Sequence, residues 1–359
     1  MNKNIFALAA AALVVSTSMT SCIEEYEPSK GSASIDQVSQ APTAYESLVS
    51  GLTSTLAGTF VYNGVENKDA DDFGYPAMMI KRDIMGQDMT PIDASGSEWF
   101  ASQYTASPYL GPQYGACQMP WTCYFKWIKS CNNVLKSYGG DNVSESHYTG
   151  VGMAYAIRAM LYLDLVRTYG ADTYAKNKQA ETVPMVTEVG AADMTKNPRM
   201  TNEAAFAFIL SDLDKAETYL ANYQRPDKTT PDLSVVYGLK ARAYLTMEDW
   251  SNAEKYAKLA MAGYSVMTGA QYTDYETGFN TPNDAWMLCV QYKATDDNIK
   301  INDADSSWGS KMITESGMLD NPLGSCGYAS NYGYPLFIDR HLYETIPATD
   351  CRKKCFVDF

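Results

Sequence analysis

Aromatic residues gather in two long segments of the sequence, 66–120 and 268–335, that lack a helical repeat and are rich in Gly, Asp and Tyr. An aromatic ring presents a flat apolar face. The apolar C–H face of a sugar ring stacks on such a surface, while the sugar hydroxyls need hydrogen-bond partners at the edge. The ligand-binding candidates in these segments are Trp99, Arg82, Asp83, Gln103, Tyr104, Tyr109, Trp308 and Tyr332. The pattern predicts a shallow site on long ordered loops, which in compact domains usually carry function. The alternative is that these rings only fix the loops to the helices.

Motifs for catalysis and for cofactors are absent from the sequence. His147 and His341 lie far apart without an HExxH motif, and no GxSxG, P-loop or GxGxxG sequence occurs. A glycosidase needs only two suitably spaced carboxylates, but nothing singles out such a pair among the 42 acidic residues. We therefore expect a protein that is not an enzyme and has no cofactor. A surface hydrolase stays open as an alternative.

One acidic run resembles the start of a calcium-binding loop. Counting from Asp69, position five is Phe73 and position twelve is Ile80, where an EF-hand needs oxygen donors. The run is better explained as a solvated acidic loop. Because no CxxC pair occurs either, we expect no metal site.

The charge balance limits the classes of ligand. The chain has 28 basic and 42 acidic residues and a net charge of −14. A spread negative charge argues against binding to nucleic acid and against direct adsorption to anionic lipid. The 27 tyrosines and 6 tryptophans supply much amphipathic surface for a neutral ligand instead.

The N-terminus has the pattern of a lipoprotein export signal. Lys3 precedes an apolar run, residues 5–15, that is too short to span a membrane, and small residues then lead to Cys22. We expect residues 1–21 to be a signal peptide and Cys22 to be the acylated first residue of the mature chain. The acidic residues Glu24 and Glu25 that follow resemble a surface-export signal of Bacteroidota lipoproteins. A plain secretory signal with an incidental cysteine is the alternative.

The rest of the sequence predicts a tether followed by one domain. Residues 22–40 are rich in Ser, Glu, Pro and Gly and predict a flexible tether, and residues 41–359 predict a single helical domain. Besides Cys22, seven cysteines occur, and their disulfide state stays open because an exported chain can pair some of them.

Helical periodicity predicts the main elements of this domain. Apolar residues recur every three or four positions in residues 45–60, 121–138, 152–169 and 201–220, with Thr201 as a helix cap and Gly170 as a helix end. Residues 284–292 are predicted as a short strand and residues 335–346 as a last helix.

The clearest unit is a predicted helical hairpin over residues 232–263. Its alanines and aromatic residues fall on the spacing of a tetratricopeptide repeat. They are Ala241, Tyr244, Trp250, Ala253, Ala257 and Ala260. Small side chains allow two helix backbones to approach closely, and we expect Tyr244 and Trp250 to fill the remaining gap. An ordinary hairpin with an alanine seam is the alternative.

These elements, in this order, resemble the SusD/RagB family of outer-membrane nutrient-binding lipoproteins. The residues that carry the resemblance are Trp127, Ile128, Asn132, Asn133, Ala156–Ala159, Leu161, Tyr162, Leu165, Val166, Tyr169, Gly170, Asp212, Leu213, Ala216, Leu220, Ala241–Leu245, Asp249, Trp250, Ala253, Ala257 and Ile346–Lys354. Together with the lipid signal they extend over nearly the whole chain. Family members usually continue past the last segment, so we expect the chain to be truncated at its C-terminus.

The resemblance implies a mainly α fold of tetratricopeptide-like hairpins with long loop insertions and a few short strands. It also implies a lipid-anchored protein on the cell outer membrane, facing outside, that binds oligosaccharide and delivers it to a SusC-like TonB-dependent transporter. The same role for peptides, or a lipid-anchored module that binds another protein, stays open.

Overall fold

The structure is a computed structural model, and it describes residues 41, 43–58, 61–62, 65–66, 71–91, 100–105, 111–187, 197–274, 276–279, 281–293, 313–314, 325–326 and 336–356. The chain divides into two compact units, Met1–Ala44 and Tyr45–Phe359. The predicted signal peptide, tether and lipid site at Cys22 lie outside the described residues.

The described part is mainly helical, as the sequence predicts, with short two-stranded pairings. The helices are α3 (Ala44–Ser54), α4 (Tyr75–Ile84), α5 (Ala101–Thr105), α6 (Gly115–Tyr138), α7 (Tyr148–Tyr169), α8 (Asn202–Tyr219), α9 (Leu233–Thr246), α10 (Trp250–Met261), α11 (Gly269–Tyr272) and α15 (Arg340–Thr345). Short 3₁₀ turns are η1 (Thr55–Ala57), η2 (Glu145–His147) and η4 (Cys351–Cys355). The antiparallel strand pairs are β1 (Val61–Tyr62) with β2 (Val65–Glu66), β3 (Met89–Thr90) with β8 (Phe337–Ile338), β4 (Glu181–Pro184) with β5 (Arg199–Thr201), and β6 (Ile313–Thr314) with β7 (Ser325–Cys326).

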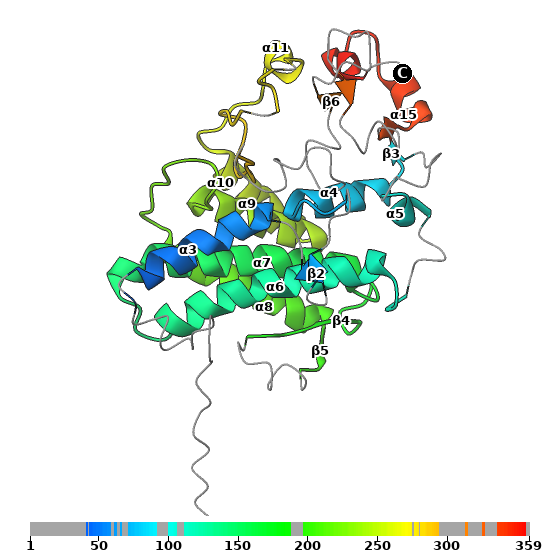
Figure 1. Cartoon of the computed structure of the whole chain (residues 1–359). Helices are drawn as coiled ribbons and strands as arrows, with labels where there is room; N and C mark the ends of the chain where they lie inside the picture. The colour runs from blue at the N-terminus through cyan, green and yellow to red at the C-terminus, as the bar shows by residue number, and fades with distance from the viewer. Residues whose placement is uncertain are drawn as a thin grey trace, which may run out of the picture. The chain divides into compact units, whose positions relative to one another are not determined.

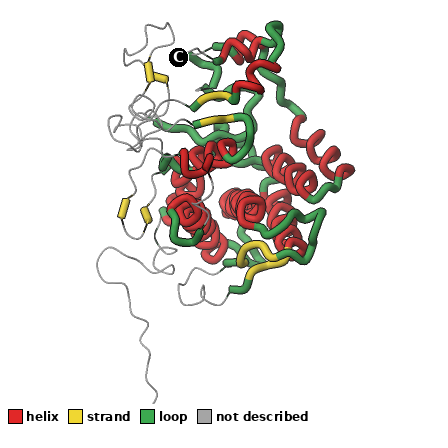
Figure 2. Tube along the Cα trace, turned by 90° about the vertical axis from the view of Figure 1, so that its right-hand side faces the viewer, coloured by secondary structure: helices red, strands yellow, loops and turns green. Residues whose placement is uncertain are grey.

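Helix α7 is the centre of the core. It packs against α6, α8 and α9. Figure 1 shows α6, α7 and α8 side by side, and Figure 2, turned by 90°, shows several helices of the chain end-on. Every residue of α7 from Gly150 to Val166 is buried, because neighbours cover the helix on all sides. A side chain at Gly152 would bring its Cβ atom within 2.7 Å of the Leu220 side chain, so glycine permits this close approach.

A buried ion pair joins α7 to α8. The Arg158 guanidinium donates to both carboxylate oxygens of Asp212, at 2.8 and 2.9 Å, and to Asn132 Oδ1 on α6 at 2.8 Å. Burial by itself lowers the pKa of Arg158, but the hydrogen bonds and charge of Asp212 outweigh burial and raise it. The pair is therefore ionised inside the core and fixes how three helices align.

The predicted hairpin is present as α9 and α10, which pack closely on each other. Ala243, Ala253 and Ala260 are buried at the contact. Tyr244 stacks on Tyr256 with ring centroids 5.5 Å apart, as a gap-filling role requires. The same expectation for Trp250 is wrong, since its side chain is 62 % exposed. Trp250 is the first residue of α10, where a side chain points away from the seam.

Two other expectations for the elements are also wrong. Segment 66–120 holds α4, α5 and the start of α6, where loops were predicted. Proline occupies the first turn of α4, a position at which proline favours a helix, so its presence did not indicate a loop. Residues 284–292 form no strand; they cross the structure as an irregular segment.

The predicted cap at Thr201 is confirmed and gives a first test. Its side-chain oxygen accepts from the Ala204 backbone N–H at 3.2 Å. We expect Thr201→Ala to lower the free energy of unfolding by about 1 kcal/mol in chemical denaturation. Thr218→Ala, on the exposed side of the same helix, is the matched control and should change it by less than about 0.5 kcal/mol. Equal losses in both variants would contradict the capping role.

Cys123, Cys131, Cys289, Cys351 and Cys355 are free thiols, and burial raises the pKa of Cys131 to about 12. Within the described part of the chain, no helix is long and apolar enough to cross a membrane.

Candidate functional site

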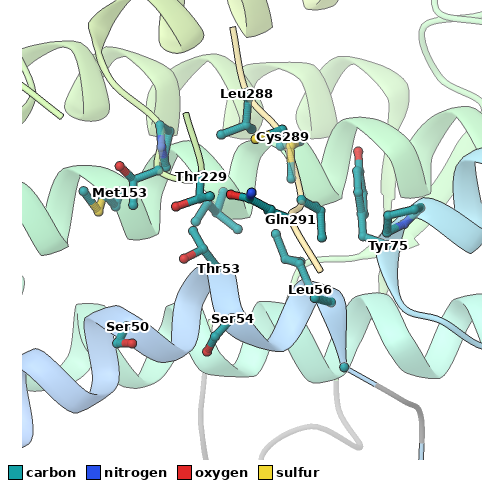
Figure 3. Close-up of a pocket in the computed structure, with 18 of the residues that line it drawn as sticks. Ser50, Thr53, Ser54, Leu56, Tyr75, Met153, Thr229, Leu288, Cys289 and Gln291 are labelled. Carbon is teal, nitrogen blue, oxygen red and sulfur yellow. The ribbon is translucent and has the colours of Figure 1, made fainter. Parts of the chain in front are cut away.

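A cavity of about 1170 Å³ lies between α3, α4 and α7 on one side and residues 223–231 and 288–293 on the other. Figure 3 shows Thr53 of α3 and Leu56 of η1 pointing toward Thr229 and Gln291. Tyr75 and Met153 lie at opposite ends of the cavity. The walls come from segments that are far apart in the sequence. The cavity is therefore a product of the fold and follows no local motif.

Helix α3 contributes polar groups to the cavity. Helix α3 buries Leu52 in the core and turns Glu46, Ser50 and Thr53 toward the cavity, at the spacing of one helix face. Thr149 from α7 and Gln291 add further polar groups. Hydroxyl and amide groups both donate and accept hydrogen bonds, which suits a ligand that carries hydroxyls.

Arg225 holds the opposite wall in place. Its buried guanidinium pairs with Asp232 at 2.9 Å, donates to the Thr230 carbonyl at 3.1 Å and to the Tyr264 hydroxyl at 2.6 Å, and also donates to the Met287 carbonyl. One side chain thus joins the segment before α9 to the irregular segment 284–293. The backbone bond from Cys289 N–H to the Lys228 carbonyl, at 2.9 Å, supports the same contact.

Tyr75 forms one end of the cavity and connects it to a second cluster. Its hydroxyl donates to Asp164 Oδ2 at 2.7 Å, and its ring contacts Tyr124 and Trp127 edge-on. Burial and the Asp164 charge raise the pKa of Tyr75, so the phenol stays protonated. Asp164 is fully buried and also accepts from Arg82 Nη1 at 2.6 Å.

The cavity combines an apolar lining, with residues such as Met153, Ile157 and Leu288, with a smaller number of polar groups. Tyr75 and Tyr223 supply aromatic faces, while threonine and serine hydroxyls and Gln291 supply hydrogen-bond partners. In the described part of the chain, no group of three or more His, Cys, Asp or Glu side chains is placed to hold a metal ion. The arrangement favours non-covalent binding of a molecule that combines apolar faces with hydroxyl groups.

Four of the eight ligand-binding candidates from the sequence lie in the described part of the chain. Arg82 and Asp83 lie near the end of α4, and Gln103 and Tyr104 lie on α5, which packs against α4. Tyr104 is 48 % exposed, whereas the side chain of Gln103 is not described. Those outside the described residues are Trp99, Tyr109, Trp308 and Tyr332.

The placed candidates differ in their surroundings. Arg82 is half-buried on Asp164; burial alone would lower its pKa, but the carboxylate outweighs this effect and raises it. Asp83 is exposed beside Asp88, and partial burial raises the pKa of Asp83. None of the four, from Arg82 to Tyr104, lines the cavity. As ligand contacts they stay predictions.

Sequence reasoning missed the cavity itself. A weak signal exists in α3, where Ser50 and Thr53 follow Glu46 on one helix face. The facing segments carry no motif, and they are held together by Arg225 with its several partners and by the backbone bond between Cys289 and Lys228. Such long-range contacts leave no periodic pattern in the sequence.

A comparison with protein-family models identifies the family of the chain. A SusD-like family model, described as starch-binding associating with outer membrane, matches residues 68–245. The chain belongs to the SusD/RagB family. The match extends from the segment before α4 into the last turn of α9. It includes α4 and α7, two of the three helices that line the cavity, and begins after α3. A search of curated protein sequences gives no significant match.

Solved structures share the fold of this SusD-like chain. A SusD-like carbohydrate binding protein from Bacteroides vulgatus superposes with a TM-score of 0.67 at 21% identity, covering 86% of this chain and 59% of that one. A SusD superfamily protein from Bacteroides thetaiotaomicron gives 0.64 at 14% identity, covering 86% and 63%. Surface glycan-binding protein A from Bacteroides uniformis gives 0.63 at 16% identity, covering 88% and 63%. The chain spans about three fifths of the length of these relatives.

Proposed function

We propose that this SusD-like protein binds carbohydrate and does not transform it. The observation that carries the proposal is the family match over residues 68–245, together with a cavity of hydroxyl, amide and aromatic groups. Sugar rings combine an apolar face with many hydroxyls, and such a cavity offers partners for both. Millimolar affinity corresponds to only about −4 kcal/mol, which a stacked ring and a few hydrogen bonds can supply.

The finer role rests on the resemblance and on the N-terminal sequence. We propose that Cys22 carries the lipid anchor and that the protein faces outside on the cell outer membrane. There it passes its ligand to a SusC-like TonB-dependent transporter. The family description, which names association with the outer membrane, supports this placement. Peptide binding by the same scaffold is the alternative, and a peptide ligand in a binding screen would favour it.

Filling the cavity tests the proposal. Thr53 faces the cavity, so Thr53→Phe is expected to weaken binding of an oligosaccharide identified by glycan array at least about tenfold, measured by isothermal titration. Thr55→Phe is the matched control, because Thr55 is exposed and does not line the cavity. Its affinity should equal that of the unchanged protein. Full affinity in Thr53→Phe would place the carbohydrate site elsewhere, for example at the aromatic loops.

A further inference from the structure

Two arginine side chains from different helices bind one buried carboxylate, and a third arginine lies close to them on the helix that carries the carboxylate. Arg82 on α4 and Arg242 on α9 both donate to Asp164 Oδ1 on α7, at 2.6 and 3.3 Å. Arg167 follows Asp164 by three residues on α7, and residues with this spacing share a helix face. The cluster therefore stands where α4, α7 and α9 approach one another.

The carboxylate is already fully engaged. Asp164 is completely buried and accepts hydrogen bonds from the Tyr75 and Tyr124 hydroxyls as well as from the two arginines. Each guanidinium has five N–H donors, and Asp164 accepts only one contact from Arg82 and one from Arg242. Several N–H groups of Arg82 and Arg242 therefore form no hydrogen bond with Asp164 and are available to another acceptor.

Two of the arginines are open to solvent. The Arg242 side chain is 42% exposed. Arg167 is exposed, and among the described residues no carboxylate pairs with it. Burial and the positive charges of Arg82 and Arg242 lower the pKa of Arg167, as expected for a guanidinium close to others of the same charge. An anion bound among the three would relieve this repulsion.

The local charge is opposite to that of the whole protein. Asp83 lies next to Arg82 and offsets part of its charge, but the three arginines still outnumber Asp164 and Asp83. The chain as a whole has a net charge of −14. A positive cluster in such a protein is a specific local feature, and the planar guanidinium matches a carboxylate or sulfate through paired hydrogen bonds.

We propose that Arg82, Arg167 and Arg242 bind the carboxylate or sulfate group of an acidic saccharide. This inference rests on the proposed carbohydrate-binding function. Tyr75 links the two sites, because its ring lines the cavity and its hydroxyl binds Asp164. An acidic unit held by the arginines would leave neighbouring sugar units to occupy the cavity, so the pair of sites would select saccharides that carry acidic groups.

The test compares neutral, uronate-containing and sulfated oligosaccharides of similar length by isothermal titration with the full chain. We expect an acidic ligand to bind more tightly than the neutral one, and Arg167→Ala to weaken it at least about tenfold while leaving neutral binding unchanged. Lys258→Ala is the control, since it removes an exposed positive charge on α10 that pairs with Glu254 on the same helix. It should leave all affinities unchanged. Whichever acidic ligand loses more affinity in Arg167→Ala identifies the anion.

The outcomes separate the two claims. If the neutral oligosaccharide binds and the acidic ones bind no better, or if Arg167→Ala binds them as well as the unchanged protein, the arginine site is refuted while carbohydrate binding stands. An equal loss in Lys258→Ala would show a general charge effect and refute the site as well. If no oligosaccharide of any kind binds, the proposed function fails and this inference fails with it.

Discussion

Arg158→Met is expected to lower the free energy of unfolding by about 3–5 kcal/mol, the largest loss that we predict for this protein. The substitution leaves the Asp212 carboxylate without its charged partner at a position where both side chains are almost fully buried. It also frees the Asn132 amide oxygen, which accepts from Arg158 at 2.8 Å. Chemical denaturation followed by circular dichroism measures the loss.

A double variant separates the charge effect from simple loss of packing. In Arg158→Met/Asp212→Leu no buried charge is left unpaired, so most of the lost stability should return. The single variant should also regain stability as the pH falls. Burial already raises the pKa of Asp212, and without Arg158 that pKa will rise further, so the folded state will bind more protons than the unfolded state. A double variant no more stable than Arg158→Met would contradict this account of the core.

Arg225→Ala is expected to cost about 2–3 kcal/mol of unfolding free energy and to weaken carbohydrate binding at least about tenfold. Arg225 joins Thr230 to Met287 and Tyr264, and its loss releases the segments 229–231 and 288–293, which line the cavity. Arg225 also pairs with Asp232, the residue that caps α9, but the Arg158–Asp212 pair that joins α7 to α8 does not involve it, so most of the helical circular dichroism signal should persist. Titration with an oligosaccharide and thermal denaturation measure the two effects.

Arg340→Ala is the matched control for Arg225→Ala. Arg340 pairs with Glu344 on the exposed side of α15, where such pairs contribute little. We expect wild-type stability and affinity for this variant. If Arg225→Ala binds the oligosaccharide as tightly as Arg340→Ala does, the wall held by Arg225 is not part of the ligand site.

Local patterns in the sequence are sufficient to predict the main helices and the hairpin. The alanine seam of α9 and α10 and the cap at Thr201 depend on neighbours within one or two helical turns, and the structure contains both. The sequence does not reveal helix α4, because the Gly, Pro, Asp and Tyr residues of segment 66–120 are typical of loops. Proline in the first helical turn stabilises a helix start, and α4 then packs Ala77 and Ile84 into a small separate core.

The candidate site was less predictable, for a physical reason. Composition indicated aromatic residues near polar ones, and the structure does place Arg82 and Tyr104 on adjacent helices. The cavity and the arginine cluster instead depend on contacts between residues far apart in the sequence, such as Arg225 with Met287 and Arg242 with Asp164. The sequence shows only that Asp164 and Arg167 are three positions apart. The structure adds that α4 and α9 approach the face of α7 that carries them.

The most direct test of carbohydrate binding is a glycan array on the purified chain, followed by titration of its best ligand and analysis of that ligand after incubation. We predict saturable binding of at least one oligosaccharide, recovery of the ligand without cleavage products, and loss of binding in Thr53→Phe but not in Thr55→Phe. Absence of binding to every glycan, or turnover of the bound one, would contradict the account.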